Sequence, residues 1–383
     1  MAKPHICLVA PQVFPVLTGD RKLQIIGGAE VQQSFIARGL CAAGYPVTIL
    51  AGDFGQPDDL EFEGLRILKM RQRGRTIPVL RYFHPRLTSI WSAMRRADAD
   101  IYYQRCAGAG TFVTGLYART HGKRFVYAAA HDLDLNSPQT FEIFQGHGGW
   151  RDLQLYRAGL KMADAIIAQH SGQVETCRRW HRRDAEQIPS GYIPPEGACC
   201  EPEGVVLWVS TMRRWKRPEL FLNLAQALPN IRFRMIGGVS MAEGDGSAQE
   251  YFSEIESSAR ALPNVEFLGY VPYREVELHF DEASLFVNTS DHEGFPNTFL
   301  QAWARGIPTV SFVNCGARDA HGPIGVVAGN LNEMKEVVAR QTADRTAWFD
   351  ESARCRQYFQ DNHAMPAVIA RYRVLFERLT NRV

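Results

Sequence analysis

The chain has 383 residues, and at about 150 residues per domain this length predicts two to three domains. Hydrophobic residues make up 45% and charged residues 22%, a composition that excludes wholesale disorder. The formal net charge is only +2, so no global field points to nucleic acid as a partner. Any charged ligand must therefore be bound by a local patch.

No apolar run reaches the roughly 18 residues that a membrane-spanning helix needs, and the first residues lack the apolar segment of a signal peptide. Eight cysteines are scattered without Cys-x-x-Cys spacing, which argues against zinc. We therefore expect reduced, buried thiols and a cytoplasmic protein.

Short apolar segments alternate with helical patterns along the first half of the chain. This alternation is typical of β-α-β units that build a parallel sheet. The predicted strands are Ile6–Ala10, Val47–Leu50, Leu65–Leu68, Ile101–Tyr103, Phe125–Ala129 and Ala165–Ala168. The predicted helices are Ala29–Ala43, Pro85–Ala97, Thr111–Thr120, Arg151–Met162 and Gln173–His181.

The strongest linker candidate follows at residues 189–197, where three prolines and two glycines fall within nine residues. A second β/α series comes next, and near the end a helix from Pro366 repeats apolar residues at three- and four-residue steps. Its predicted strands are Val205–Val209, Ile231–Ile236, Val265–Leu268, Leu285–Val287 and Thr309–Phe312.

These patterns predict an α/β fold with two doubly wound domains. The first spans residues 1–192 and the second residues 198–365, and we expect the helix at 366–383 to pack back on the first domain. Ligands of open α/β sheets bind at the carboxyl ends of the strands. We therefore expect the site at a cleft where both sets of carboxyl ends meet, in loops that follow strands.

The most informative loop follows the strand that ends near Val287. Pro296 suits the first position of a helix, so the N–H groups of Gly294 and Phe295 would lie beside a helix N-terminus. Such a terminus favours an anion, for example a diphosphate. Glu293 can accept hydrogen bonds from hydroxyls next to that anion. The alternative is purely structural: an N-capping glutamate, a helix and a Gly-x-Pro turn.

A second loop, after the strand Val205–Val209, carries four cations in five residues, Arg213 to Arg217. Arginine offers a fork of donors and lysine a point charge, and both suit a diphosphate. The alternative is a solvated basic turn.

The segment that begins at Glu293 resembles the Glu-x7-Glu signature of retaining glycosyltransferases of family 4, whose GT-B fold has two Rossmann-like domains facing across a cleft. Gln301 stands at the position of the second glutamate. The resemblance implies that Glu293 contacts hydroxyls of the donor sugar and that Gln301 occupies the ribose-binding position. Glutamine can still hydrogen-bond a diol there, but it loses the stronger charge-assisted bond.

The same resemblance implies that Arg213 and Lys216 bind the donor pyrophosphate and stabilise the leaving group, with Arg214 as a helper. Gly27 and Gly28 match a Gly-Gly-Ala-Glu element at the start of the first long helix. Glycines there let backbone amides approach a phosphate or sugar closely. This element is not the Gly-x-Gly-x-x-Gly dinucleotide fingerprint, which argues against a dehydrogenase.

Three more segments, which hold five residues, match the family only by their place in the chain. His131 follows the strand Phe125–Ala129, where the family has a histidine beside the donor sugar. Tyr270 and Val271 match the loop beside the nucleobase, and Ser190-Gly191 match a hinge turn.

The segment Asp132-Leu133-Asp134 spells an Asp-x-Asp, which holds a divalent metal in another glycosyltransferase fold. In a chain with two Rossmann-like halves we interpret it as loop capping, and we predict no metal site and no cofactor other than the nucleotide-sugar donor.

Two basic clusters are candidates for contact with an anionic membrane, although solvated helix faces explain them as well. Aromatic residues interleave with the arginines in both. The clusters are Arg71, Arg73, Arg75, Arg81, Arg86, Arg95 and Arg96, and Arg178, Arg179, Arg182 and Arg183.

The resemblance implies a cytoplasmic, metal-independent hexosyltransferase that moves a sugar from a nucleotide-diphosphate donor to a glycan or lipid-linked acceptor with retention. The protein would act in glycan, polysaccharide or glycolipid biosynthesis. Any contact of the protein with the inner membrane face would be peripheral. Two alternatives stay open: a nucleotide-sugar epimerase of the same architecture, or an inactive nucleotide-sugar-binding subunit.

Overall fold

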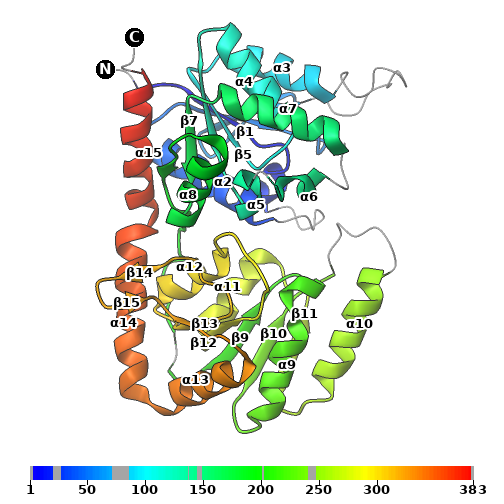
Figure 1. Ribbon diagram of the computed structural model, residues 1–383, viewed down its shortest axis with the longest axis vertical. Coiled ribbons are helices and arrows are strands. Elements are labelled where there is room, and N and C mark those ends of the chain that lie inside the picture. Colours follow the sequence, from blue (N-terminus) through cyan, green and yellow to red (C-terminus); the bar gives the residue numbers. More distant parts are fainter. Residues whose placement is uncertain are drawn as a thin grey trace. The chain divides into compact units, whose positions relative to one another are not determined.

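The computed structural model describes residues 3–19, 27–70, 86–136, 138–144, 149–200, 202–239 and 247–380. Contacts divide the chain into two units. Unit 1 consists of Met1–Gly191 and Met365–Val383, and unit 2 of Tyr192–Ala364. Each unit is built around its own mostly parallel sheet (Figure 1).

The sheet of unit 1 has the strand order β3-β4-β2-β1-β5-β6-β7-β8. All neighbouring strands are parallel except β3 and β4, which form an antiparallel hairpin. The chain order reverses between β1 and β5, which makes this the topological switch point. The strands are β1 Ile6–Val9, β2 Val47–Ala51, β3 Asp59–Phe62, β4 Leu65–Lys69, β5 Ile101–Arg105, β6 Arg124–Ala128, β7 Ala165–Ala168 and β8 Glu186–Gln187.

Helices cover both faces of this sheet, which explains why its central strands are apolar on both sides. One face packs against α2 and α15, and the other against α3, α4 and α7. The helices are α1 Phe14–Thr18, α2 Gly28–Ala42, α3 Arg86–Ala97, α4 Gly110–Thr120, α5 Asp132–Leu135, α6 Thr140–Phe144, α7 Gly149–Met162, α8 Ser171–His181 and α15 Met365–Thr380.

The last helix, α15, belongs to the core of unit 1. Tyr372 and Phe376 are buried in the cluster that also holds the central strands. Gly39 of α2 allows the two helices to approach closely, because a Cβ there would lie 2.8 Å from Met365 and Ile369. The packing therefore depends on an apolar face of α15 and on a glycine in the helix opposite.

The main sheet of unit 2 is fully parallel, in the order β11-β10-β9-β12-β13-β16. Its switch point lies between β9 and β12. A small antiparallel pair, β14 and β15, stands apart from it. The strands are β9 Val205–Val209, β10 Phe233–Ile236, β11 Val265–Gly269, β12 Ala283–Asn288, β13 Thr309–Ser311, β14 Arg318–Asp319, β15 Gly322–Pro323 and β16 Val326–Val327.

The apolar core of unit 2 gathers the central strands with α9, α10 and α13. Helices α9 and α10 lie side by side (Figure 1). The helices are α9 Pro218–Ala227, α10 Ser247–Arg260, α11 Tyr273–Asp281, α12 Asn297–Arg305, α13 Leu331–Ala343 and α14 Arg345–Asn362, and a 3-10 turn spans Arg214–Lys216.

The predicted α/β class with doubly wound sheets is confirmed, and predicted strands and helices fall on observed ones with shifts of a few residues. Strand β4 was predicted as Leu65–Leu68, but its antiparallel partner β3 was missed because this short edge strand lacks the buried apolar run of a parallel strand. All eight cysteines are free, but the prediction that they are buried is wrong for Cys199, which is exposed, and for the half-buried Cys41, Cys106 and Cys200.

Within the described part of the chain, no helix combines the length and apolar character needed to cross a bilayer.

Replacing Phe376 with alanine should lower the free energy of unfolding of unit 1 by about 3–5 kcal/mol, because it opens a cavity in a packed core. Phe376 is fully buried and packs on Tyr45 and Tyr372. The control is Val374→Ala on the same helix, where the side chain is 66% exposed. Urea unfolding measures both, and equal midpoints for the two variants would contradict the buried role of α15.

Candidate functional site

A cluster of polar and charged side chains lies at the switch point of the unit 2 sheet. The loop after β9 carries the basic turn, and the loop after β12 carries Glu293. Because β9 and β12 are adjacent and parallel, both loops leave the same edge of the sheet. The two motifs, which are about 80 residues apart in the sequence, therefore meet in space.

The contact between them is an ion pair between Lys216 Nζ and Glu293 Oε1. The side chains are only 11% and 12% exposed, so the pair is largely withdrawn from water. Burial lowers the pKa of Lys216, Glu293 raises it, and the charge of Arg213 lowers it further. Both cations belong to the same turn, and the charge of Arg213 acts on Lys216.

The Glu293 carboxylate is held through one of its two oxygens. Asn288 Nδ2 at 3.3 Å and Ser290 Oγ at 2.7 Å also donate to Oε1. Among the residues that the structure describes, Oε2 has no hydrogen-bond partner. The carboxylate is therefore fixed in position while one oxygen can accept a hydrogen bond from a ligand.

The backbone of the basic turn is tied to the β12 loop. Thr289 Oγ1 donates to Lys216 O at 2.8 Å, and Asp291 N donates to Trp215 O at 2.9 Å. The Trp215 ring stacks on His292 at a centroid distance of 4.7 Å. These contacts fix the relative positions of the two loops without any ligand.

The other arginines of the turn differ in their partners. Arg217 binds Glu219 and Asp291 at 2.7 and 2.9 Å, and its φ of 50° turns the chain from the 3-10 turn into α9. Arg214 lies over the ring of Tyr251 at 4.6 Å. Arg217 therefore has a structural role, since its ion pairs hold the turn to α9 and to the loop after β12.

The helix N-terminus beside Glu293 begins one residue later than predicted. Pro296 has an extended ψ of 122° and is the N-cap, so Asn297 is the first helical residue of α12. Gly294 is buried, and the ring of Phe295, which precedes the helix, packs against Trp303 of α12. The Gly294–Pro296 segment thus still leads directly into the helix start, where free N–H groups favour an anion.

Gln301 is 2% exposed, and its Nε2 donates to Glu277 Oε1 at 2.9 Å. The other oxygen of Glu277 accepts from Tyr192 at 2.6 Å and from Arg305 at 3.0 Å. The fully buried Arg305 also pairs with Asp281 at 2.7 Å. Gln301 therefore belongs to a buried polar network, and a glutamate at this position would face Glu277.

The loop after β10 packs closely against the loops after β9 and β11. A Cβ on Gly237 would lie 2.1 Å from Ser210 O, and one on Gly238 would lie 2.9 Å from Tyr270 Cβ. Tyr270 is 48% exposed and Val271 is half-buried. Gly237 and Gly238 were not among the predicted site residues, although a Gly-Gly directly after a strand is a detectable signal. Asn288 and Ser290, part of a polar triplet that ends an apolar strand, were not among them either.

The remaining predicted residues lie in unit 1. Gly27 is the N-cap of α2, and Gly28 is its first residue. His131 is the N-cap of α5, and its Nδ1 accepts from Leu133 N at 3.1 Å, which places the proton of a neutral ring on Nε2. The structure thus groups Arg213, Lys216, Glu293 and Gly294–Pro296 in unit 2, and His131 and the glycines in unit 1.

The Asp-x-Asp segment caps its loop. Asp134 is 3% exposed and accepts from Ala130 N at 2.6 Å and His131 N at 3.1 Å. Burial raises its pKa. Asp132 accepts from His170 and Gln173, both at 2.9 Å. In the described ranges, no three or more His, Cys, Asp or Glu side chains are grouped so as to hold a metal ion.

The basic clusters are partly occupied by structural contacts. Arg183 donates to Leu160 O and Ala163 O at 3.0 and 2.6 Å, and Arg178 pairs with Asp184. Arg71, Arg73, Arg75 and Arg81 lie outside the described residues, as does the side chain of Arg86. Membrane contact therefore stays a prediction.

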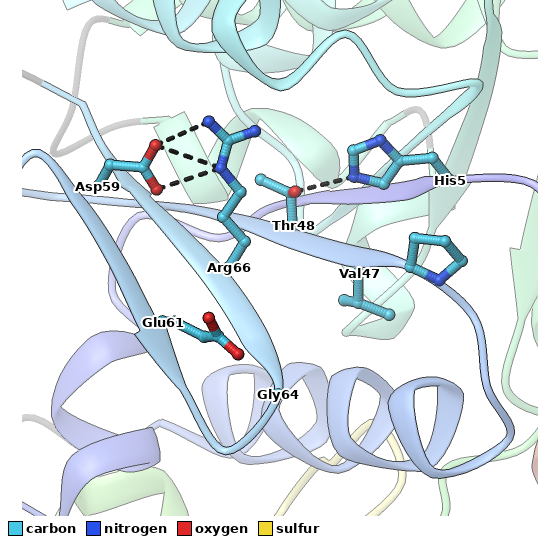
Figure 2. Close-up of a pocket in the computed structure, with 8 residues that line it drawn as sticks. His5, Val47, Thr48, Asp59, Glu61, Gly64 and Arg66 are labelled. Atoms are coloured by element: carbon cyan, nitrogen blue, oxygen red, sulfur yellow. Dashed lines mark hydrogen bonds and ion pairs between the residues drawn. The ribbon is translucent and has the colours of Figure 1, made fainter.

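A separate hollow of about 390 Å³ lies at the amino ends of the unit 1 strands (Figure 2). His5 Nε2 is 2.8 Å from Thr48 Oγ1, and burial lowers the pKa of His5. Arg66 forms a bidentate contact with Asp59 (Figure 2). These groups bind one another at the edge opposite to the predicted site residues, so the hollow is not part of the candidate site.

Two family models match the chain. "Glycosyl transferase 4-like domain" covers residues 27–191, and "Glycosyl transferases group 1" covers residues 196–340. Among curated proteins, the chain is 31% identical over 125 residues to the O-antigen biosynthesis glycosyltransferase WbnH of Escherichia coli, which is 33% of this chain and 31% of that protein. The chain thus spans about a third of the length of this relative.

A longer match joins the chain to mannosylfructose-phosphate synthase of Agrobacterium fabrum, with 25% identity over 361 residues, 82% of this chain and 77% of that protein. Among solved structures, sucrose-phosphate synthase of Thermosynechococcus elongatus has a TM-score of 0.76 and 16% identity, with full coverage of both chains. HepE of Anabaena with UDP and glucose has a TM-score of 0.69 and 15% identity, covering 99% of this chain and 100% of that one.

The two doubly wound units and these structural neighbours define the GT-B fold. The two family models, one for each unit, identify the chain as a GT-B glycosyltransferase of the family 4 type.

Replacing Gln301 with glutamate should lower the free energy of unfolding by about 2 kcal/mol at pH 8, because it removes a donor and sets two carboxylates 2.9 Å apart. One carboxyl then keeps its proton to a higher pH in the folded state, so the deficit should shrink as the pH falls toward 5. Urea unfolding at both pH values measures the effect.

The matched control is the exchanged pair Glu277→Gln with Gln301→Glu, which restores one carboxylate and one amide and should recover part of the stability. A Gln301→Glu variant as stable as the unmodified protein at pH 8 would contradict the network.

Proposed function

We propose that the protein transfers a hexose from a nucleoside-diphosphate sugar to an acceptor hydroxyl, with retention of anomeric configuration. The observation that carries this proposal is the buried pair of Lys216 and Glu293 at the switch point of unit 2. It lies between a basic turn and a helix N-terminus, and Glu293 Oε2 has no hydrogen-bond partner within the part of the chain that the structure describes.

The diphosphate is the first part of the donor that this arrangement suits. Lys216 and Arg213 supply positive charge, and the N–H groups around Gly294 and Phe295 supply the polarised backbone of a helix start. The neighbour HepE, whose structure contains UDP and glucose, supports a nucleotide-sugar donor in a protein of this fold.

The sugar and the base of the donor have candidate contacts on either side of the diphosphate. Glu293 Oε2 would accept a hydrogen bond from a sugar hydroxyl, since Oε1 is already occupied. Tyr270 and Val271, beside the tight backbone contact of Gly237 and Gly238, would border the base. His131, Gly27 and Gly28 of unit 1 are proposed to contact the sugar and phosphate through a ring N–H and backbone amides.

In the reaction, the bond between the anomeric carbon and the diphosphate oxygen breaks, and a bond forms to the acceptor oxygen on the same face of the sugar. The acceptor proton passes to the departing diphosphate. Arg213, Lys216 and the amides before α12 stabilise the charge that grows on that group, and such aimed donors are usually the largest catalytic contribution. Since side chains supply this charge, we propose that transfer needs no metal, so EDTA should leave the rate unchanged.

The acceptor is proposed to be a glycan or a lipid-linked saccharide. The relative WbnH, named for O-antigen biosynthesis, supports this class. The protein would then act in glycan, polysaccharide or glycolipid biosynthesis.

Replacing Lys216 or Glu293 with alanine should each reduce sugar transfer by about 10²- to 10³-fold, the usual effect of removing one preorganised charge contact. The donor is first chosen by a thermal-shift panel of UDP, GDP and ADP and their sugars, because a bound ligand raises the melting temperature. Transfer of labelled sugar to a lipid and oligosaccharide extract is then measured.

Matched controls are Lys335→Ala and Glu336→Ala on the exposed face of α13, which should leave transfer unchanged. Unchanged rates in both site variants would contradict the site. Conversion of the donor without any acceptor would instead favour an epimerase, and donor binding without turnover would favour an inactive subunit.

Replacing Glu293 with glutamine should shift the pH dependence of nucleotide binding. Glu293 raises the pKa of Lys216, whereas burial and Arg213 lower it. Without the carboxylate the pKa of Lys216 falls, so the lysine loses its charge at a lower pH and nucleoside-diphosphate affinity declines earlier as the pH rises. Titration calorimetry between pH 7 and 10 tests this, and identical profiles for the two proteins would contradict the coupling.

A further inference from the structure

Unpartnered buried polar atoms gather at the carboxyl edge of the unit 1 sheet. In the described part of the chain, seven buried side-chain nitrogen or oxygen atoms have no hydrogen-bond partner. Four of them lie at this edge: Gln104 Oε1, Arg105 Nε, Thr111 Oγ1 and Gln169 Oε1. Since buried polar groups are normally satisfied, such a concentration requires an explanation.

Among these four residues, Arg105 carries the largest free-energy cost of burial, because its side chain is charged. It is the last residue of β5, which borders the switch point of the sheet, and it is only 6% exposed. Its guanidinium donates to Ser190 Oγ at 3.3 Å and to Tyr103 OH at 3.5 Å. No carboxylate pairs with it within 4 Å among the described residues. A buried cation without a counter-charge is strongly unfavourable, so an anion from outside the chain is the natural partner.

Gln169 supplies a hydrogen-bond acceptor, whereas Arg105 supplies a donor. It follows β7, is 3% exposed, and its Nε2 donates to Ala129 O and Ala130 O at 3.0 and 3.2 Å. These two carbonyls fix the orientation of the amide, because only its nitrogen can donate to them. Oε1 is thereby left as an acceptor that needs a donor.

Arg105 ends β5 and Gln169 directly follows β7, so strand alternation continued by one residue would place both side chains on the same face of the sheet. On β5, Tyr103 belongs to the core shared with α2 and α15, and Arg105 follows two residues later. On β7, Ile167 belongs to the same core, and Gln169 follows two residues later. An unpartnered cationic donor and an unpartnered acceptor thus share one face at one edge.

The groups around Arg105 are held in place. Gln32 of α2 binds both backbone groups of Gly191, accepting from its N at 3.0 Å and donating to its O at 2.8 Å. This fixes the neighbouring Ser190, whose hydroxyl receives the hydrogen bond from Arg105. The guanidinium is therefore positioned before any ligand arrives, as a binding site requires.

We propose that Arg105 and Gln169 form a subsite in unit 1 that binds an acidic group of the sugar acceptor, a carboxylate or a phosphate. Arg105 pairs with the anionic oxygens, and Gln169 Oε1 accepts from a neighbouring hydroxyl. The subsite rests on the proposed function, since it treats the bound sugar acid as the acceptor. Arg105 borders the switch point, and both residues lie at the carboxyl edge of the sheet, where open α/β sheets bind ligands.

Thermal shift and titration calorimetry of the full chain test the subsite with three sugars: glucose 6-phosphate, glucuronate and glucose. The proposal predicts binding of at least one acidic sugar and a clear preference for it over glucose. Binding of the phosphate alone indicates a sugar-phosphate acceptor, and binding of glucuronate alone indicates a uronic-acid acceptor. Binding of none of them, or equal binding of glucose, would overturn the proposal.

Arg105→Gln should raise the dissociation constant of the acidic sugar by at least about 30-fold, the effect of removing one partner of a buried charged contact. Because it removes an unpaired buried charge, it should leave the melting temperature of the free protein equal or higher, whereas a structural role would lower it. Arg105→Lys, which keeps the charge, should bind more tightly than Arg105→Gln.

The matched control is Arg183→Gln, which removes an arginine bonded to two carbonyls and should lower the melting temperature while keeping sugar-acid binding. Sugar-acid binding retained in Arg105→Gln would overturn the assignment. UDP, GDP and ADP are measured in parallel on every variant. If the three nucleotides fail to bind while the acidic sugar binds through Arg105, this result contradicts the proposed function and supports the subsite.

Discussion

The candidate site depends on an ion pair that is costly to bury. Lys216 and Glu293 lie almost out of water, so each charge loses most of its hydration and is supported by the other and by nearby donors. Hydrogen bonds hold both loops in place and offset part of this cost. Thr289 and Asp291 bind the backbone of the basic turn. Asn288 and Ser290 bind the Glu293 carboxylate. The charges are therefore preorganised before a ligand binds, which is how a site stabilises charge that develops in a reaction.

Each unit has a largely buried carboxylate at the carboxyl edge of its sheet, and backbone or side-chain donors hold that carboxylate in place. In unit 1 the buried carboxylate of Asp134 accepts hydrogen bonds from the loop after β6, through Ala130 N and His131 N. In unit 2, Glu293 receives donors from the loops after β9 and β12. A single carboxylate thus organises the carboxyl edge of each sheet, the edge where open α/β folds bind ligands.

Much of the fold could be predicted from the sequence because parallel strands buried on both faces leave apolar runs that few other structures leave. The site was predictable where its chemistry is local, as in the four cations of the basic turn and the Gly-Phe-Pro before α12. It was not predictable where partners are distant in the chain. Glu277, which binds Gln301, lies 24 residues earlier on another helix. Nothing in the local sequence shows that Arg105 has no carboxylate partner among the described residues.

The central claim is that the basic turn and the start of α12 grip a diphosphate. A crystal structure of the protein with UDP or GDP, whichever binds more tightly, tests it most directly. The account predicts both phosphates between the side chains of Arg213 and Lys216 and the backbone N–H groups of Gly294 and Phe295. Phosphates bound anywhere else on either unit would contradict it.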